Sequence, residues 1–344
     1  IIKINNPINF LNRFANLKRK NCHAKVLAIT GSAGKTSLKN MIYSLLSYYE
    51  KTYASPKSFN NYIGVPLSLS NINLSHKYGV FEVGMSKAGE IYKLSKLIKP
   101  NLAVITNIAE AHIENFKNIK GIAKAKSEII DNIEDNGTII LNRDDKFFNY
   151  LYKKSKKKNI KIITFGKSKK SDFCLVKINR RVNFDIVNVQ AKNKLIKIKI
   201  KNVNVHNVLA SLAILEALNL KIDKETNLFL NILPSDGRGK IHQIKRYKRK
   251  FKLIDESYNS NPLSVKNALI NFSKIKKNNF KKYLLLGDML ELGKKSEFYH
   301  KNLSELINSS DIDKVFVTGE KTLFTYKNLK KEKRGNILQT ASDI

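Results

Sequence analysis

Cysteines, acidic residues and long apolar runs are all scarce in this chain of 344 residues. The two cysteines, Cys22 and Cys174, are too few for a disulfide framework or a structural zinc site, so two reduced thiols are expected. No apolar run approaches the roughly 18 residues that span a bilayer. The first twenty positions mix Asn, Lys and Arg without the apolar stretch of a signal peptide. We therefore expect a soluble, cytoplasmic protein with no membrane partner.

The shortage of acidic residues leaves a large positive charge, because 28 Asp and Glu oppose 64 Lys and Arg for a formal net charge of +36. Such an excess can indicate nucleic-acid binding, since Lys and Arg displace counterions from phosphates. Here the lysines are scattered, with short runs at 153–158 and 245–252 and no basic stripe with interleaved aromatics. A composition bias at exposed positions is the preferred interpretation. Attraction of a small polyanionic substrate and nucleic-acid binding are the alternatives.

The length allows two or three domains, and a chain that is 42% hydrophobic with 15 glycines is neither disordered nor collagen-like. Short apolar runs alternate with helical stretches, which predicts a mostly parallel sheet. Strands are expected at Val26–Ile29, Val80–Val83, Leu102–Ile105 and Thr138–Leu141, helices at 91–98 and 122–133, strand-like alternation over 160–200, and a further helix at 208–218.

The turn-forming stretch Pro234–Gly239 separates two patterned regions and is the predicted domain boundary. A second βαβ series is expected beyond it, with strands at 251–254, 283–286 and 315–317 and helices at 263–272 and 296–307. The chain opens on Ile1 and stops at Ile344 after only three strands of this series. Both ends are therefore expected to be incomplete.

A phosphate-binding loop is the clearest motif. Gly31-Ser32-Ala33-Gly34-Lys35-Thr36 follows a predicted strand and precedes apolar residues at helical spacing, which makes a chance glycine turn a poor alternative. Backbone N–H groups and the helix start would surround a polyphosphate, while Lys35 neutralises phosphate oxygens and the Thr36 hydroxyl ligates Mg²⁺. The full Walker pattern needs a glycine where this chain has Ile29, so the match is to a shorter form.

Polar residues at strand ends are further candidates, since ligands of parallel sheets bind at the carboxyl edge. Glu82 ends a strand and is a plausible Mg²⁺ ligand, and His112 follows the next strand at the same edge. Taken alone, a single histidine is more often structural, and Lys126 would be a solvated charge. Polar loops at 255–262 and 286–293 follow two more strands, and they indicate either a binding edge or capped turns.

Together these segments resemble the Mur ligases, and within that family the branch that adds D-alanyl-D-alanine. The similarity extends from about Ala24 to the end of the chain. It is carried by Thr30–Ser37, Phe59–Pro66, Thr106–Ile108 with His112 and Ala125–Glu128, Asp255–Pro262 and Leu286–Gly293. The last two segments favour this branch over its sisters, which usually carry a His-bearing loop where this chain has 257–262.

The resemblance implies roles for the matching residues. ATP phosphates would be held by Gly31, Ser32, Ala33, Gly34, Lys35, Thr36 and Ser37, and the nucleotide by Asn142, Asn207, Arg238 and Asp255. Two Mg²⁺ ions would be bound by Thr36, Glu82, His112 and a CO₂-carbamylated Lys126, and the catalytic residues would be Lys35, His112 and Lys126. UDP-MurNAc-tripeptide would meet Asn60 and Asn61, and D-Ala-D-Ala would meet Tyr258, Asn259 and Asn261.

The same resemblance implies an α/β fold in three segments. These are a linker remnant at 1–23 with a helix at 7–20, a central ATP-binding domain at 24–233, and a truncated Rossmann-like ligase domain at 234–344. The family's N-terminal substrate domain is expected to be missing. Asn204, Ala210 and Glu256 depart from the family pattern, and the first two lie in the segment from which the resemblance implies adenine contacts.

The implied activity is ATP-dependent amide ligation through an acyl phosphate by a monomeric enzyme of peptidoglycan precursor synthesis. A Mur-like ligase with another amino acid or peptide substrate, a nucleic-acid-linked NTPase and a non-catalytic binding remnant are the alternatives.

Overall fold

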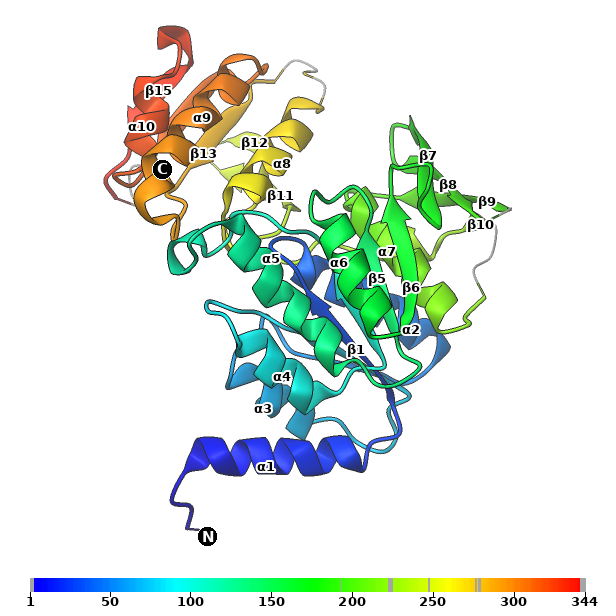
Figure 1. Cartoon of the computed structure of the whole chain (residues 1–344). Helices are drawn as coiled ribbons and strands as arrows, with labels where there is room; N and C mark the ends of the chain where they lie inside the picture. The colour runs from blue at the N-terminus through cyan, green and yellow to red at the C-terminus, as the bar shows by residue number, and fades with distance from the viewer. Residues whose placement is uncertain are drawn as a thin grey trace. The chain divides into compact units, whose positions relative to one another are not determined.

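The computed structural model describes residues 3–192, 194–221, 225–246, 248–275, 277 and 280–340 (Figure 1). The chain divides into two compact units. The first contains Ile1–Ile108 and Lys120–Ser235, and the second contains Ala109–Ile119 and Asp236–Ile344. The outermost residues of the predicted 1–23 and 234–344 segments, 1–2 and 341–344, lie outside the described residues.

The first unit is built on a ten-stranded sheet in the order β10-β9-β8-β7-β6-β5-β4-β1-β3-β2. The strands from β2 to β7 in this order pair in parallel, whereas β7, β8 and β9 pair antiparallel. The predicted α/β class with a mostly parallel sheet is thereby confirmed. The strands are β1 Lys25–Thr30, β2 Thr52–Ala54, β3 Tyr78–Glu82, β4 Leu102–Ile105, β5 Thr138–Asn142, β6 Lys161–Gly166, β7 Phe173–Arg180, β8 Asp185–Ala191, β9 Lys194–Ile200 and β10 Glu225–Thr226.

Helices bury the apolar strands of this sheet. Within β1, Val26–Ile29 form a continuous apolar run, as expected for a parallel strand that is covered on both faces. α2 and α7 pack against each other in the core, while α4 and α6 contact β1 and β5 on the viewer's side in Figure 1. The helices are α1 Pro7–Lys20, α2 Lys35–Tyr49, α3 Gly64–Ser70, α4 Glu90–Ile98, α5 Ile119–Ser127, α6 Phe148–Lys157 and α7 Val205–Ala217.

The helix predicted over 122–133 is shorter than expected. α5 ends at Ser127, and a 3₁₀ turn, Glu128–Asn132, follows it. The Glu128 carboxylate accepts hydrogen bonds from the backbone N–H groups of Gly89 and Tyr92, at 2.9 and 3.0 Å. It therefore caps the start of α4, where unpaired N–H groups and the helix dipole favour an anion. This tertiary contact coincides with the change from α to 3₁₀ geometry.

The N-terminal helix α1 forms where a helix was predicted. Asn6 caps it by accepting from the Asn9 N–H at 2.9 Å, and a proline occupies its first position. Near its other end, the Arg19 guanidinium donates to the carbonyls of Ile98 and Lys99, at 2.6 and 2.7 Å. These carbonyls lie at the end of α4, which has unpaired acceptors. The helix is thus part of the first unit.

The second unit has a three-stranded parallel sheet, a separate hairpin and three α-helices among its described residues. The sheet runs in the order β13-β14-β15, and the hairpin pairs β11 with β12. The elements are β11 Lys240–Arg246, β12 Arg249–Asp255, α8 Pro262–Ser273, β13 Tyr283–Leu286, α9 Ser296–Asn308, β14 Lys314–Val317, α10 Thr322–Lys327 and β15 Arg334–Ile337.

One prediction for this unit was wrong. The strand expected at 251–254 was placed in a parallel series with 283–286, but in the described structure it pairs antiparallel with β11, Lys240 opposite Asp255. Its sequence fits this pairing, because charged residues at 249, 250 and 252 interrupt the apolar ones, and residues 249–253 are all exposed. Parallel strands covered on both faces are continuously apolar, whereas this alternation is typical of an antiparallel strand with a solvated face.

The structure also bears on the two cysteines and on the shortage of long apolar runs. Cys22 and Cys174 are both buried free thiols, as expected. Across the described parts of the chain, we find no helix with the length and apolar character needed to cross a bilayer.

Candidate active site

The loop between β1 and α2 adopts the shape of a phosphate-binding loop. Gly31 and Gly34 have φ angles of +150° and +82°, in the region that favours glycine, and α2 begins at Lys35. The second residue after β4, Asn107, holds this loop from one side. Asn107 accepts the Ser32 N–H with its backbone carbonyl and the Ala33 N–H with its side-chain oxygen, both at 2.9 Å.

Gly31 is the tightest point of this loop. A Cβ added there would lie 1.9 Å from the Thr106 hydroxyl oxygen, and the φ angle would be strained as well. We expect Gly31→Ala to destabilise the first unit by roughly 2 to 4 kcal/mol, the sum of backbone strain and overpacking. The shift in the urea midpoint measures this loss.

Gly89 offers a matched control. Its φ angle is +84°, but a Cβ added there would have no atom within 4 Å. Gly89→Ala therefore carries only the backbone cost, about 1 kcal/mol. Equal losses of unfolding free energy for the two variants would show that the close approach of Thr106 to Gly31 adds no cost to the substitution.

A buried carboxylate lies beside the loop. Glu82, at the end of β3, is 1% exposed. The Thr36 hydroxyl donates to its Oε2 and the Asn60 amide donates to its Oε1, both at 2.7 Å. The Thr36 hydroxyl also lies 3.2 Å from that of Ser58. The structure thus brings together two predicted metal ligands and one predicted substrate residue.

This cluster can hold a hard cation. Carboxylate and hydroxyl oxygens are the ligands that Mg²⁺ accepts, and Mg²⁺ usually keeps several waters and substrate phosphates in its shell. Among the residues that the structure describes, no three His, Cys, Asp or Glu side chains gather in a metal-binding group. A cation at Thr36 and Glu82 would therefore complete its shell with phosphate and water oxygens.

Two lysines share one carbonyl of the loop. The Lys35 ammonium donates to the Gly31 carbonyl at 2.8 Å, and the Lys126 ammonium donates to the same oxygen at 3.1 Å. Lys126, on α5, is 2% exposed. Its burial, with a smaller effect from the positive charge of Lys35, holds the pKa of Lys126 well below its usual range. The neutral form of the Lys126 amine is therefore populated more easily than that of an ordinary lysine.

Lys39 is a residue of this site that the sequence interpretation missed. It lies one turn after Lys35 on α2 and is 1% exposed. Its ammonium donates to the carbonyl of Ser55 at 2.7 Å and to that of Lys57. It thereby fastens α2 to the segment that leads to Asn60. Its signal in the sequence was a charge at a buried helical position, four residues after Lys35.

The predicted nucleotide residues of the first unit have defined contacts. The Asn142 amide donates to the Thr106 carbonyl at 3.1 Å. The side chain of Asn207 lies against Gly34, since a Cβ on that glycine would be 3.2 Å from its Oδ1. Asn204, which departs from the family pattern, caps α7 by accepting the His206 N–H at 2.9 Å.

Ala210, the other departure, is buried in the core on α7. The two departing positions therefore have structural roles in this chain, one as a helix cap and one in packing. The predicted substrate residue Asn61 has a similar role. Its side-chain oxygen accepts the Gly64 N–H at 2.8 Å, at the start of α3.

The predicted residues of the second unit gather around the segment after β12. Asp255 accepts from the Ser257 hydroxyl at 2.6 Å and from the Gly237 N–H at 3.0 Å. The hydrogen bonds from Ser257 lower the pKa of Asp255, so this carboxyl is ionised at neutral pH. The Arg238 guanidinium stacks over the Tyr258 ring, 4.3 Å from its centroid.

Two asparagines near Tyr258 accept hydrogen bonds from backbone N–H groups close to them in the chain. Asn261 forms a capping box with Ser264 at the start of α8, and Asn259 accepts the Ser260 N–H at 2.8 Å. The capped-turn interpretation thus describes Asn261 well. Its cap orients the loop that carries Tyr258, which is exposed.

His112 was predicted to lie at the sheet edge with Glu82. His112 lies in the stretch Ala109–Ile119, which belongs to the second unit, and its position at that edge stays a prediction. There its Nδ1 contacts the carboxylate of Glu291. Glu291 was not among the predicted site residues, although it lies in the polar loop singled out in the sequence.

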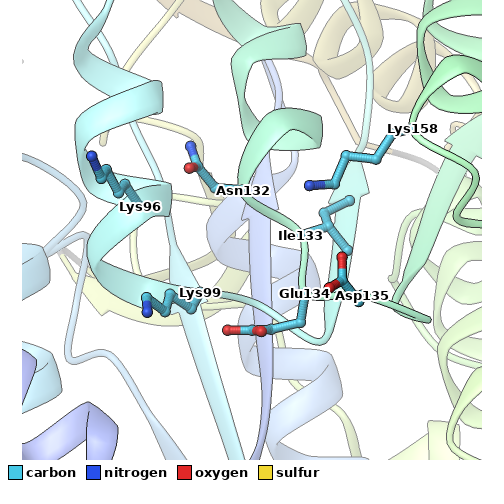
Figure 2. Close-up of a pocket in the computed structure, with 7 residues that line it drawn as sticks. All are labelled: Lys96, Lys99, Asn132, Ile133, Glu134, Asp135 and Lys158. Atoms are coloured by element: carbon cyan, nitrogen blue, oxygen red, sulfur yellow. The ribbon is translucent and has the colours of Figure 1, made fainter.

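The first unit also has a pocket of about 280 Å³ away from these residues (Figure 2). The segments that form it precede β4 and β5, at the amino ends of parallel strands. The phosphate loop follows the carboxyl end of β1, the edge where such sheets bind ligands. The pocket is therefore separate from the predicted nucleotide site. It is lined by Lys96, Lys99, Asn132, Ile133, Glu134, Asp135 and Lys158.

Two family models match this chain. The Mur ligase middle domain matches residues 29–215, and the Mur ligase glutamate ligase domain matches residues 239–342. Among curated proteins, a UDP-N-acetylmuramoyl-tripeptide–D-alanyl-D-alanine ligase of Rickettsia prowazekii is 34% identical over 330 residues, covering 95% of this chain and 72% of the relative. The ligase of the same name from Buchnera aphidicola is 35% identical over 322 residues, covering 93% and 70%.

Solved structures agree with this result. MurF from Acinetobacter baumannii is similar with a TM-score of 0.88 and 27% identity, covering 99% of this chain and 73% of that one. MurF from Thermotoga maritima, solved in complex with ADP, is similar with a TM-score of 0.85 and 25% identity, covering 98% and 76%.

Proposed function

Since this chain belongs to the Mur ligase family, we propose that it joins D-Ala-D-Ala to UDP-MurNAc-tripeptide at the expense of ATP. As a Mur ligase it is an ATP-dependent enzyme of peptidoglycan precursor synthesis that forms a C–N bond. The proposed substrates are those named for its relatives. The observation that carries the proposal is the phosphate loop next to the buried Glu82 cluster.

The ATP polyphosphate is proposed to lie on the loop 31–37. The Lys35 ammonium and the start of α2 provide positive charge where the β- and γ-phosphates would lie. A Mg²⁺ ion is proposed at the Thr36 hydroxyl and Glu82 carboxylate, with His112 and a modified Lys126 serving a second ion. When bound, Mg²⁺ would offset phosphate charge. Asn142, Asn207, Arg238 and Asp255 are the other proposed nucleotide residues.

The proposed modification of Lys126 is a carbamate. Its neutral amine would attack the carbon of CO₂, forming an N–C bond while one C=O π bond gives its electron pair to oxygen. The nitrogen then releases one proton, which leaves an anion with two oxygen ligands. Three features support this proposal: the low pKa of Lys126, its burial, and the Lys35 ammonium that shares the Gly31 carbonyl and would balance the new charge. Hard Mg²⁺ accepts such carboxylate-like oxygens.

The proposed reaction has two steps. The tripeptide carboxylate attacks the γ-phosphorus of ATP, which forms an acyl phosphate and releases ADP. The amine of D-Ala-D-Ala then attacks the acyl carbon, and phosphate leaves with the electron pair of the C–O bond. Lys35 would hold the phosphates against the repulsion of the carboxylate, while Asn60 and Asn61 would position the tripeptide. Tyr258, Asn259 and Asn261 would bind the dipeptide.

Substrate dependence tests this proposal. ADP release by the purified chain is expected to require both UDP-MurNAc-tripeptide and D-Ala-D-Ala, with mass spectrometry detecting the pentapeptide product. Release with another amino acid or dipeptide instead would favour a different Mur-like ligase. Stimulation by DNA or RNA would contradict the prediction of no nucleic-acid partner. ATP binding without ADP release, even with every substrate present, would identify a non-catalytic chain. The monomeric state stays a prediction.

A further inference from the structure

One contact of the second unit links a predicted catalytic residue to a residue without an assigned role. The Nδ1 of His112 contacts the Oε2 of Glu291, in the loop after β13. The backbone joins the same two segments, because the Glu114 N–H donates to the Glu291 carbonyl at 3.3 Å. Side chain and main chain thus hold the His112 segment against the same glutamate.

The backbone around this contact is specialised. His112 and Glu291 have φ angles of 59° and 60°, a left-handed conformation that is unusual for residues with a side chain. Gly293 approaches Glu114 so closely that a Cβ on Gly293 would lie 2.9 Å from that of Glu114. Strained conformations persist where their surroundings enforce them, and they cluster at functional sites.

The loop that carries Glu291 is itself anchored. The Met289 N–H donates to Nε2 of His300 at 3.0 Å, and His300 Nδ1 lies 2.8 Å from the Ser296 carbonyl. Met289, Leu292 and His300 are all buried. Glu291 therefore lies in a loop that is held by buried residues before and after it, Met289 and Leu292.

We propose that Glu291 is a positioning residue that fixes the ring orientation and tautomer of His112. A carboxylate at Nδ1 places the proton of the neutral ring on that nitrogen, so the lone pair lies on Nε2. Histidines that bind metals commonly have their second nitrogen held in this way. The inference rests on the proposed function, because it gives His112 the tautomer that its proposed Mg²⁺ role requires.

The tautomer can be measured without ATP or metal. In protein labelled with ¹⁵N-histidine, at about pH 8.5 where an ordinary histidine is neutral, the ¹⁵N shifts of His112 should report a proton on Nδ1. His112→Gln identifies the resonances. Glu291→Ala should move the proton to Nε2, the tautomer that a free side chain prefers. Glu291→Gln keeps an acceptor oxygen and should retain the native tautomer.

Activity provides the second measurement. Glu291→Ala should lower kcat by about 10- to 100-fold, the range for loss of a residue that orients a metal ligand, with little change in KM for ATP. Glu291→Gln should recover most of that loss. Glu320→Gln removes the same charge at an exposed position of this unit and should match the unsubstituted chain in both measurements.

The outcomes separate this inference from the proposed function. An unchanged tautomer in Glu291→Ala overturns the inference, and so does a shifted tautomer with full ligase activity. If the unsubstituted chain has no ligase activity, the proposed function fails, and the tautomer result alone then supports or overturns the positioning of His112 by Glu291.

Discussion

Lys35→Ala is expected to reduce substrate-dependent ADP release by about 1,000-fold, the scale on which a single cation contributes to phosphoryl transfer. The reason is electrostatic. A carboxylate must approach the γ-phosphate, and Lys35 supplies positive charge at the first residue of α2, where the helix dipole adds to it. Steady-state ADP release with all substrates measures the loss.

This prediction has a matched control. Lys93→Ala removes the same charge from an exposed position on α4 and should leave the rate unchanged. Both variants should remain folded, and their thermal unfolding transitions are the control that separates a loss of catalysis from a loss of structure. Retention of more than a tenth of the activity by Lys35→Ala would contradict a phosphate role for this residue.

Lys126→Ala is expected to lower ligation by about 100-fold and to recover part of it when formate or acetate is added. The substitution removes the proposed carbamate and its oxygen ligands for Mg²⁺, and the loss should be at least as large as the roughly 10- to 100-fold typical for the groups that only support metal ligands. It also empties a buried volume beside the Gly31 carbonyl, into which a small carboxylate can enter. Initial rates over a range of carboxylate concentrations measure the recovery.

Lys126→Met separates the loss of the amine from the opening of a cavity. Methionine removes the amine but fills most of the volume, so this variant should be as inactive as Lys126→Ala and should not respond to added carboxylates. Full activity of Lys126→Ala, or equal responses of both variants, would argue against the carbamate.

The sequence predicted the first unit well because its signals are local. A strand, a glycine loop and a helix follow one another within 25–49, and each is specified by its own residues. The parallel sheet follows from the alternation of such elements. The caps at Asn204 and Asn261 are also local, and the structure shows that capping chemistry, rather than only ligand chemistry, explains these asparagines.

What the sequence did not predict depends on pairing between distant segments. The pairing of β11 with β12 was missed because it depends on two strands together and not on the residues of either one. The segment 283–286, with which 251–254 was expected to form a parallel series, is a short apolar run of the same length. Lys39 and Glu291 were missed for a related reason. Glu291 looks like a solvated charge along the chain, and Lys39 is marked only by its place among the apolar positions of a helix. The role of each depends on carbonyls or a histidine that only folding brings near.

The discontinuity of the second unit has a consequence for how the chain is made. Its stretch 109–119 is synthesised well before 236–344, and its partner for His112, Glu291, comes late. During translation His112 can meet Glu291 only after residue 291 has been made, and non-local contacts of this kind slow folding. A fragment cut at 235/236 would likewise carry Glu291 without His112. The order of synthesis therefore delays the contact between this histidine and Glu291 until long after the histidine itself has been made.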